Sequence, residues 1–305
     1  MGKRIIQIRV ILERLYARYN RSRFIKTDPL QFVYQYSNRA DMEIAGFLAA
    51  ELAYGRVQQI EKSLVDLLGR MGDSPFKFVQ NFDKQKRAKL KNFKHRFTTG
   101  DDISDLLMLL KKVLNQYDSI EKFFLRGYNP SDKNIISALS RFCDSLLDMY
   151  IQTHNCSVRR GLSYLLPRPV AGSACKRLNL FLRWMVRNDS VDAGLWNTID
   201  KAKLIVPVDV HMGRLCRILG LYPVRSNPAK SERPLSVQTS NGAYDRNTIS
   251  LRATVKITEG FAQIEPADPV KYDFALSRLG IVDNCTGRLR SGCESCELFG
   301  FCCNR

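Results

Sequence analysis

The spacing of the apolar residues is the feature that most limits what this chain can fold into. Apolar side chains recur every three or four residues along most of its 305 residues, and the strict alternation that marks a β-strand is scarce. The pattern predicts an all-α fold. The predicted helices lie near residues 1–20, 40–55, 101–117, 131–150, 172–187, 208–221, from about 249 onward, and 268–281.

One segment interrupts the helical pattern. Residues 222–247 are rich in Pro, Ser and Asn and hold few large apolar side chains, so we expect a long surface loop. The first predicted helix has basic residues among its apolar ones and is not a signal peptide, and no window is long and apolar enough for a membrane span. We therefore expect a cytoplasmic protein in a reducing compartment.

The charge of the chain indicates a polyanionic partner. It holds 48 Lys and Arg against 30 Asp and Glu, a formal net charge of +18. Residues 84–96 carry seven of the basic side chains without one carboxylate. A solvated basic helix or loop would explain that run alone. Together with the overall charge it favours nucleic acid as the partner, with an anionic membrane surface as the alternative.

Five cysteines gather at the end of the sequence. Cys285, Cys293, Cys296 and Cys302 have the spacing C-x7-C-x2-C-x5-C, and Cys303 is left over. A two-residue gap lets two thiolates converge from one turn, and the longer loops bring in the other two. Four sulfur ligands suit a four-iron four-sulfur cluster or zinc, and reduced thiols without metal are the third possibility. In a reducing compartment we do not expect disulfides.

The cysteine tail and a second motif resemble a known superfamily. The tail "RLGIVDNCTGRLRSGCESCELFGFCC" resembles the C-terminal iron-sulfur loop of endonuclease III and its relatives, the helix-hairpin-helix DNA glycosylases, with a first loop one residue longer. Upstream, "VPVDVHMGRLCRILGL" is similar to the segment of those enzymes in which a Val-Asp-x-His run opens a helix. The chain as a whole, from about residue 28, resembles the domain-of-unknown-function 2400 family of bacteria.

The resemblance implies two catalytic residues. Asp209 matches the catalytic aspartate of the glycosylases, and Lys176 fits the lysine that their lyase-type members carry after the hairpin. The hairpin is degenerate here: "LLPRPVAGSACK" retains Gly172 but has Ala174 in place of the second glycine. The separation of 33 positions from Lys176 to Asp209 resembles that in archaeal 8-oxoguanine glycosylases, which implies an oxidised purine as substrate.

Elementary chemistry is consistent with this assignment. If Ser173 caps the helix, Lys176 lies near the positive end of the helix dipole, which disfavours the ammonium form and makes a better nucleophile. Asp209 precedes its own helix, where free backbone N–H groups favour the carboxylate. An aspartate in that position is, however, often only a helix cap, and a first-turn lysine is often a solvated charge or a phosphate contact.

Further residues are candidates for contacts with DNA or with a flipped base. The hairpin supplies two, the predicted helix at 40–55 and the residue after it supply three, and the segments that resemble the glycosylases supply the rest; we interpret His211 as structural or DNA-facing, not as a metal ligand. The candidates are Gly172, Ser173, Glu51, Tyr54, Arg56, His211, Arg288 and Arg290.

These observations combine into one expectation. A two-lobed glycosylase-like protein would have residues 1–39 and 201–305 in one lobe, with a cluster loop at 282–305, and residues 40–200 in the other. A monomer would act in base-excision repair on double-stranded DNA near the nucleoid, with strand-lyase activity left open. The alternatives are a non-catalytic DNA-binding protein of the same fold and a zinc-containing RNA-binding factor.

Overall fold

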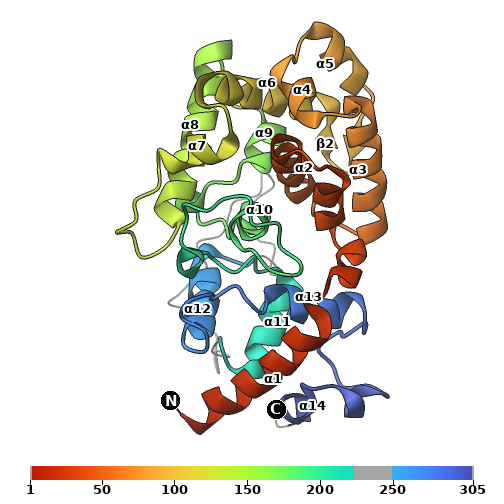
Figure 1. Ribbon diagram of the computed structural model, residues 1–305, viewed down its shortest axis with the longest axis vertical. Helices are drawn as coiled ribbons and strands as arrows, with labels where there is room; N and C mark the ends of the chain where they lie inside the picture. Colours follow the sequence, from red (N-terminus) through yellow and green to blue (C-terminus); the bar gives the residue numbers. More distant parts are fainter. Residues whose placement is uncertain (1, 223–248, 304–305) are drawn as a thin grey trace. The chain divides into compact units, whose positions relative to one another are not determined.

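The computed structural model describes residues 2–222 and 249–303, and these are mostly helical (Figure 1). Within them only two short strands occur, as the apolar spacing predicts for an all-α chain. The chain divides into two compact units. Unit 1 holds Met1–Phe24, Pro169–Arg183 and Asp200–Arg305, and unit 2 holds Ile25–Arg168 and Trp184–Ile199.

Unit 1 is built around α13. The buried side of α13 contacts α1 and α11, and Figure 1 shows α1 running alongside α13. Three apolar residues of α1, Ile8, Leu12 and Leu15, are almost fully buried, each adding roughly 1.5–3 kcal/mol of hydrophobic stabilisation. The elements of unit 1 are α1 (Lys3–Tyr19), η3 (Pro169–Ala171), α10 (Lys176–Val186, whose last residues belong to unit 2), η4 (Lys201–Lys203), α11 (Val210–Leu219), α12 (Leu251–Ala262), α13 (Asp273–Ile281), η5 (Cys293–Ser295) and α14 (Phe299–Cys303).

Unit 2 is built around α6, which contacts the five helices α4, α5, α7, α8 and α9. Its apolar residues recur at helical spacing and most of them are fully buried, so α6 forms the centre of this core. The elements are η1 (Ser22–Thr27, which starts in unit 1), η2 (Pro29–Gln35), α2 (Arg39–Glu51), α3 (Val57–Met71), α4 (Pro75–Gln80), α5 (Lys84–Leu90), β1 (Lys94–His95), β2 (Thr98–Thr99), α6 (Gly100–Tyr117), α7 (Ile120–Leu125), α8 (Ile136–His154) and α9 (Arg160–Leu165).

The first helix of unit 2 starts earlier than the sequence predicts. The sequence pattern favours Asp41 as the cap, but the Asn38 side chain accepts from the Ala40 and Asp41 amides and α2 begins at Arg39. The Asp41 carboxylate instead accepts hydrogen bonds from Ser74 Oγ at 2.6 Å and Phe76 N at 2.9 Å. It therefore fixes the start of α4 to α2, a long-range contact that local spacing does not reveal.

A hairpin interrupts the helices of unit 2. β1 and β2 pair antiparallel, with Lys94 opposite Thr99 and His95 opposite Thr98, so Arg96 and Phe97 form the turn. Arg96 has a φ of 54°, the left-handed region that a tight two-residue turn requires. The hairpin begins at the end of the basic run of residues 84–96, of which the first part is the helix α5.

Two expectations from the sequence concern the surface loop and the boundaries between the lobes. The predicted surface loop at 222–247 falls, except for its first residue, outside the described residues. The compact units divide after Phe24 and before Asp200, where the sequence predicts lobe boundaries near 39 and 200. Residues 169–183, which the prediction assigns to the central lobe, cluster with the terminal segments. None of the described helices combines the length and the apolar content that crossing a membrane requires.

Candidate functional site

The two predicted catalytic side chains are in contact inside unit 1. Lys176 Nζ lies 3.1 Å from Asp209 Oδ2, although 33 residues separate them in the sequence. The Lys176 side chain is 35% exposed and the Asp209 side chain 45%, so a ligand can reach both. The lobe ranges expected from the sequence place Lys176 and Asp209 in different lobes, whereas both belong to the same compact unit.

Lys176 is the first residue of α10, and the chain before it is held by local bonds. Cys175 stands at the N-cap position with a φ of 46°, and its carbonyl accepts from Asn179 N. The prediction that Ser173 caps this helix is wrong: Ser173 Oγ accepts from Cys175 N, which precedes the helix, and α10 starts two residues later than such a cap requires. The short left-handed turn places Lys176 directly at the positive end of the helix dipole.

Asp209 is the N-cap of α11. Its Oδ1 accepts from Met212 N at 2.8 Å, while its Oδ2 faces Lys176, so one carboxylate serves both the helix and the ion pair. The preceding apolar segment is buried, and Val206 N donates to Thr258 Oγ1 of α12. Hydrogen bonds of the residues before and after Asp209 therefore fix its position.

The surroundings of Asp209 keep it ionised. Partial burial raises its pKa, but the Lys176 ammonium, the hydrogen bond from Met212 N and the nearby His211 together outweigh that effect, so the pKa lies below its ordinary value. The carboxylate is thus available as a negative charge at neutral pH. Such a group can stabilise a developing cation or accept a proton from an adjacent amine.

A second, buried ion pair lies on the same helix face as Lys176. Arg183 is seven residues further along α10 and donates to the Asp273 carboxylate of α13, with both side chains almost fully buried. Burial raises the pKa of Asp273 to about 6, against the opposing effect of Arg183, and Asp209 and Lys176 are close enough to contribute. The sequence analysis missed this pair. Its only signal was an arginine inside the apolar run of residues 178–186.

His211 and the turn at Gly172 are both held by neighbouring helices of unit 1. A Cβ on Gly280 of α13 would meet His211 Nε2 at 2.5 Å, so the imidazole ring lies directly over that glycine. Burial has the largest effect and lowers the pKa of His211. Arg214 lowers it further and Asp209 acts in the opposite direction, and the net decrease favours the neutral ring. Both observations concern packing within unit 1, and the interpretation of His211 as structural or DNA-facing stays a prediction. Gly172, with a φ of 82°, accepts a hydrogen bond from Leu251 N, which ties the turn to α12.

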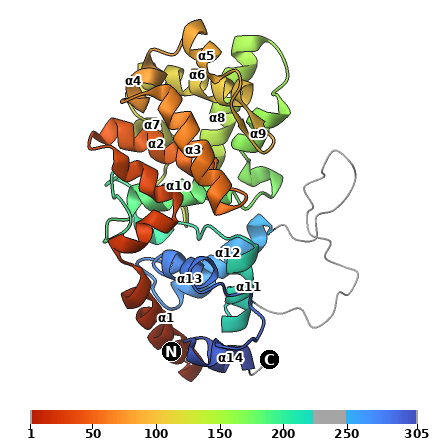
Figure 2. The ribbon, with the colours of Figure 1, turned by 90° about the vertical axis from the view of Figure 1, so that its right-hand side faces the viewer.

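The cysteine loop packs on α1 and α11. Arg18 forms an ion pair with Glu297 at 3.0 Å, and Arg214 donates to the Thr286 carbonyl. Figure 2 shows α14 next to the end of α11. Arg288 is exposed, and Arg290, also exposed, donates to the Asp283 carbonyl at 2.6 Å.

The four cysteines of the tail are of a residue type that binds metals, but the described residues do not gather them into a metal-binding group. All four are half-buried and none forms a disulfide, and burial, with the neighbouring Cys285 and Cys293, raises the pKa of Cys296. Within the described residues, no three His, Cys, Asp or Glu side chains are placed as a metal-binding group. The donor set fits iron or zinc, since soft thiolates in one loop are ligands that both accept. Cys303, the fifth thiol, is exposed.

The remaining candidates belong to unit 2. Glu51 is buried at 1% exposure, and Arg56 is exposed at the start of α3. Tyr54 is half-buried, and its hydroxyl lies 2.9 Å from the His95 carbonyl and 2.7 Å from Thr98 Oγ1. The structure therefore separates the predicted residues into two groups, one on each unit.

Comparison with family models gives a match over most of the chain. A family model described as "Protein of unknown function (DUF2400)" matches residues 28–282, which is most of the chain. The search of curated proteins and the search of solved structures gave no match. The matched range includes Lys176, Asp209 and the hairpin of unit 2, and it ends before the four cysteines. The chain belongs to the DUF2400 family.

Proposed function

We propose that this protein is a DNA glycosylase that uses Lys176 and Asp209 to release a damaged base. The observation that carries the proposal is the 3.1 Å contact between an accessible amine and an ionised carboxylate, each at the start of a helix. The resemblance of both segments to the helix-hairpin-helix glycosylases supports it, and so does the net charge of +18, because DNA is a polyanion. The separation of the two residues favours an oxidised purine.

The reaction would begin with a nucleotide rotated out of the duplex, since its C1′ atom is not accessible inside the base stack. Asp209 would take a proton from Lys176. The amine lone pair would then form a bond to C1′ while the glycosidic bond breaks and its electron pair leaves with the base, which takes up a proton. Opening of the sugar ring gives a Schiff base, and the Asp209 carboxylate stabilises the cationic character at C1′.

The cysteine loop would have a structural function. We propose Cys285, Cys293, Cys296 and Cys302 as ligands of a four-iron four-sulfur cluster, with zinc as the alternative. The four thiolates would hold either group, and the bound group would cross-link the loop between Cys285 and Cys302. Arg288 and Arg290 would then lie on an ordered loop, where their guanidinium groups can contact phosphate.

Borohydride trapping tests the catalytic proposal. Purified protein is incubated with duplexes that contain 8-oxoguanine, uracil or an abasic site, and borohydride reduces any Schiff base to a stable adduct. Lys176→Gln and Asp209→Asn should lose the adduct and the released base but keep DNA affinity. Lys201→Gln is the matched control, because Lys201 forms a 3.9 Å ion pair with Asp268 in the same unit and should react normally.

The outcomes separate the alternatives. DNA binding without any adduct or base release would favour a non-catalytic DNA-binding protein. Base release that survives Lys176→Gln would indicate attack by water with Asp209 alone. A colourless protein with zinc and a preference for structured RNA would favour the RNA-binding factor.

Metal analysis tests the cysteine loop separately. Protein purified without oxygen should be brown and contain iron. The Cys293→Ser variant should lose the colour and the iron. Cys303→Ser is the control for a general thiol effect, since Cys303 lies outside the proposed ligand set. Equal metal content in the two variants would contradict the assignment.

A further inference from the structure

We infer that Arg96 and Phe97, with Tyr54 and Tyr164, form a stacking platform for an unpaired base of single-stranded DNA. This deepens the proposed function, from which it takes DNA as the partner. The platform lies within unit 2, where Figure 1 labels the hairpin strand β2 close to α2 and α3. None of its four residues takes part in the Lys176–Asp209 pair.

Phe97 is the most unusual side chain of this group, because an aromatic ring at a hairpin tip is 53% exposed. The Tyr54 ring stacks on it at 5.1 Å between centroids and 27° between planes. The Tyr164 ring meets it edge-on at 4.5 Å and 84°. Two rings thus support Phe97 from within the protein, and the exposed half of its surface is free to stack on a further ring.

Arg96 adds a positive charge beside the rings. Its guanidinium carbon lies 5.7 Å from the Phe97 centroid and 5.9 Å from the Tyr54 centroid. Within the described residues it has no carboxylate partner. A nucleotide can then place its phosphate against the guanidinium group and stack its base on the exposed ring.

The hairpin is held rigidly beneath the platform. Besides the bonds of the Tyr54 hydroxyl, His95 Nδ1 lies 2.8 Å from Ser63 Oγ, and His95 Nε2 lies 3.0 Å from the Tyr54 carbonyl. His95 is fully buried, so these bonds are shielded from water. A preformed surface loses less conformational entropy on binding than a mobile loop does.

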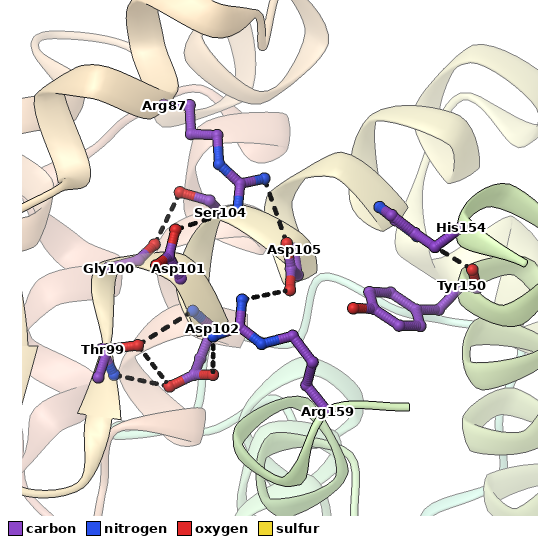
Figure 3. Close-up of polar contacts among 10 residues, drawn as sticks. All are labelled: Arg87, Thr99, Gly100, Asp101, Asp102, Ser104, Asp105, Tyr150, His154 and Arg159. Atoms are coloured by element: carbon purple, nitrogen blue, oxygen red, sulfur yellow. Dashed lines mark hydrogen bonds and ion pairs between the residues drawn. The ribbon is translucent and has the colours of Figure 1, made fainter. Parts of the chain in front are cut away.

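A buried carboxylate network fixes the other end of the hairpin (Figure 3). Asp102 accepts from the Thr99 amide at 2.8 Å, and Arg159, one residue before α9, lies 3.8 Å from the same carboxylate. Asp105 pairs with Arg159 and with Arg87 of α5, both at 3.2 Å. The network therefore joins the hairpin that carries Phe97 to α9, which carries Tyr164.

The charges around the platform favour nucleic acid over a membrane surface. Lys89, Lys91 and Lys94 precede it in the chain and are exposed, and Arg56 follows Tyr54 after one glycine. Membrane insertion needs a broad apolar face, as an interfacial amphipathic helix provides. A single supported ring among cations is instead typical of the surfaces on which bases stack.

Binding of two short strands to the whole chain tests the inference. One is fluorescein-labelled oligodeoxythymidine, and the other is an abasic strand of equal length and charge. Wild type should prefer the thymidine strand, and Phe97→Ala should weaken its binding about 5- to 100-fold with little effect on the abasic strand. Phe97→Trp should restore the preference, and its indole fluorescence should be quenched by the thymidine strand, because Trp184 and Trp196 are buried.

Ile151→Ala is the matched control, since Ile151 is an exposed apolar residue of the same unit, and it should bind as wild type does. Equal affinity of wild type for the two strands, or an unchanged preference in Phe97→Ala, would overturn the inference. Binding only to phosphatidylglycerol vesicles, reduced by Phe97→Ala, would overturn it in favour of a membrane surface. Loss of preference in Phe97→Ala together with no borohydride adduct would keep the platform and reject the glycosylase.

Discussion

At the residue scale, Asp209 combines a structural and a chemical function in one carboxylate. One oxygen caps α11 and the other faces Lys176. The carboxylate can act as a helix cap with a salt bridge and as the charged member of a catalytic pair. Substitution can separate them, because asparagine caps a helix about as well as aspartate but has no charge.

Asp209→Asn and Asp209→Ala should therefore behave differently in stability and alike in activity. The alanine variant loses the cap and should lower the free energy of unfolding by about 0.5–2 kcal/mol, whereas the asparagine variant should stay close to wild type. Both should lose the borohydride adduct. Urea unfolding and trapping of the two proteins side by side check this. An active Asp209→Asn would leave Asp209 as a cap only.

The candidate site was predictable from the sequence in part. Lys176 and Asp209 were singled out because their segments resemble known motifs, and the structure places them in contact. The buried pair of Arg183 and Asp273 was not predicted, since a charged residue in an apolar helix does not reveal its partner 90 residues away. Phe97 was not predicted, because it follows the basic run of residues 84–96, whose pattern indicates charge and gives no signal for an exposed ring.

At the element scale, most of the long helices were predicted, but the 15-residue helix α3 was missed. The ranges 101–117 and 208–221 correspond closely to α6 and α11, because an apolar stripe and a cap residue are both local signals. The short helices and the hairpin at 94–99 were not predicted. They depend on tertiary contacts such as those of Asp41 with α4 and Tyr54 with the hairpin.

Close packing of α9 on Asp102 gives a prediction at this scale. A Cβ on Gly161 would lie 2.1 Å from Asp102 Oδ1 and would disturb the capping box of α6. Gly161→Ala should therefore lower the free energy of unfolding by about 1–3 kcal/mol.

Gly69→Ala is the matched control for that substitution. Gly69 lies inside α3 with open space around its Cα, so alanine there should raise the stability by about 0.5–1 kcal/mol. Urea unfolding of both variants gives the two values. Equal changes in the free energy of unfolding of the two variants would show that Asp102 does not constrain α9.

At the scale of the whole molecule, the excess of positive charge should govern DNA affinity. Each phosphate contact releases a counterion, so the logarithm of the affinity falls linearly with the logarithm of the salt concentration. The exposed lysines before the platform are the first candidates for such contacts.

Lys94→Gln should reduce the salt slope of single-strand binding by about 1, because one phosphate contact is removed. Lys3→Gln changes the total charge equally but lies at the start of α1 in unit 1, and it should leave the slope unchanged. Anisotropy titrations over a range of salt concentrations measure both slopes. The same decrease of the salt slope in both variants would mean that the affinity depends only on the total charge.

The central claim is that the amine of Lys176 becomes bonded to the sugar. The most direct measurement is mass spectrometry of the borohydride-reduced adduct after proteolysis. The account predicts that the modified peptide contains Lys176 and carries the sugar on its Nζ atom. Modification of another lysine, or no adduct with any of the damaged duplexes, would contradict it.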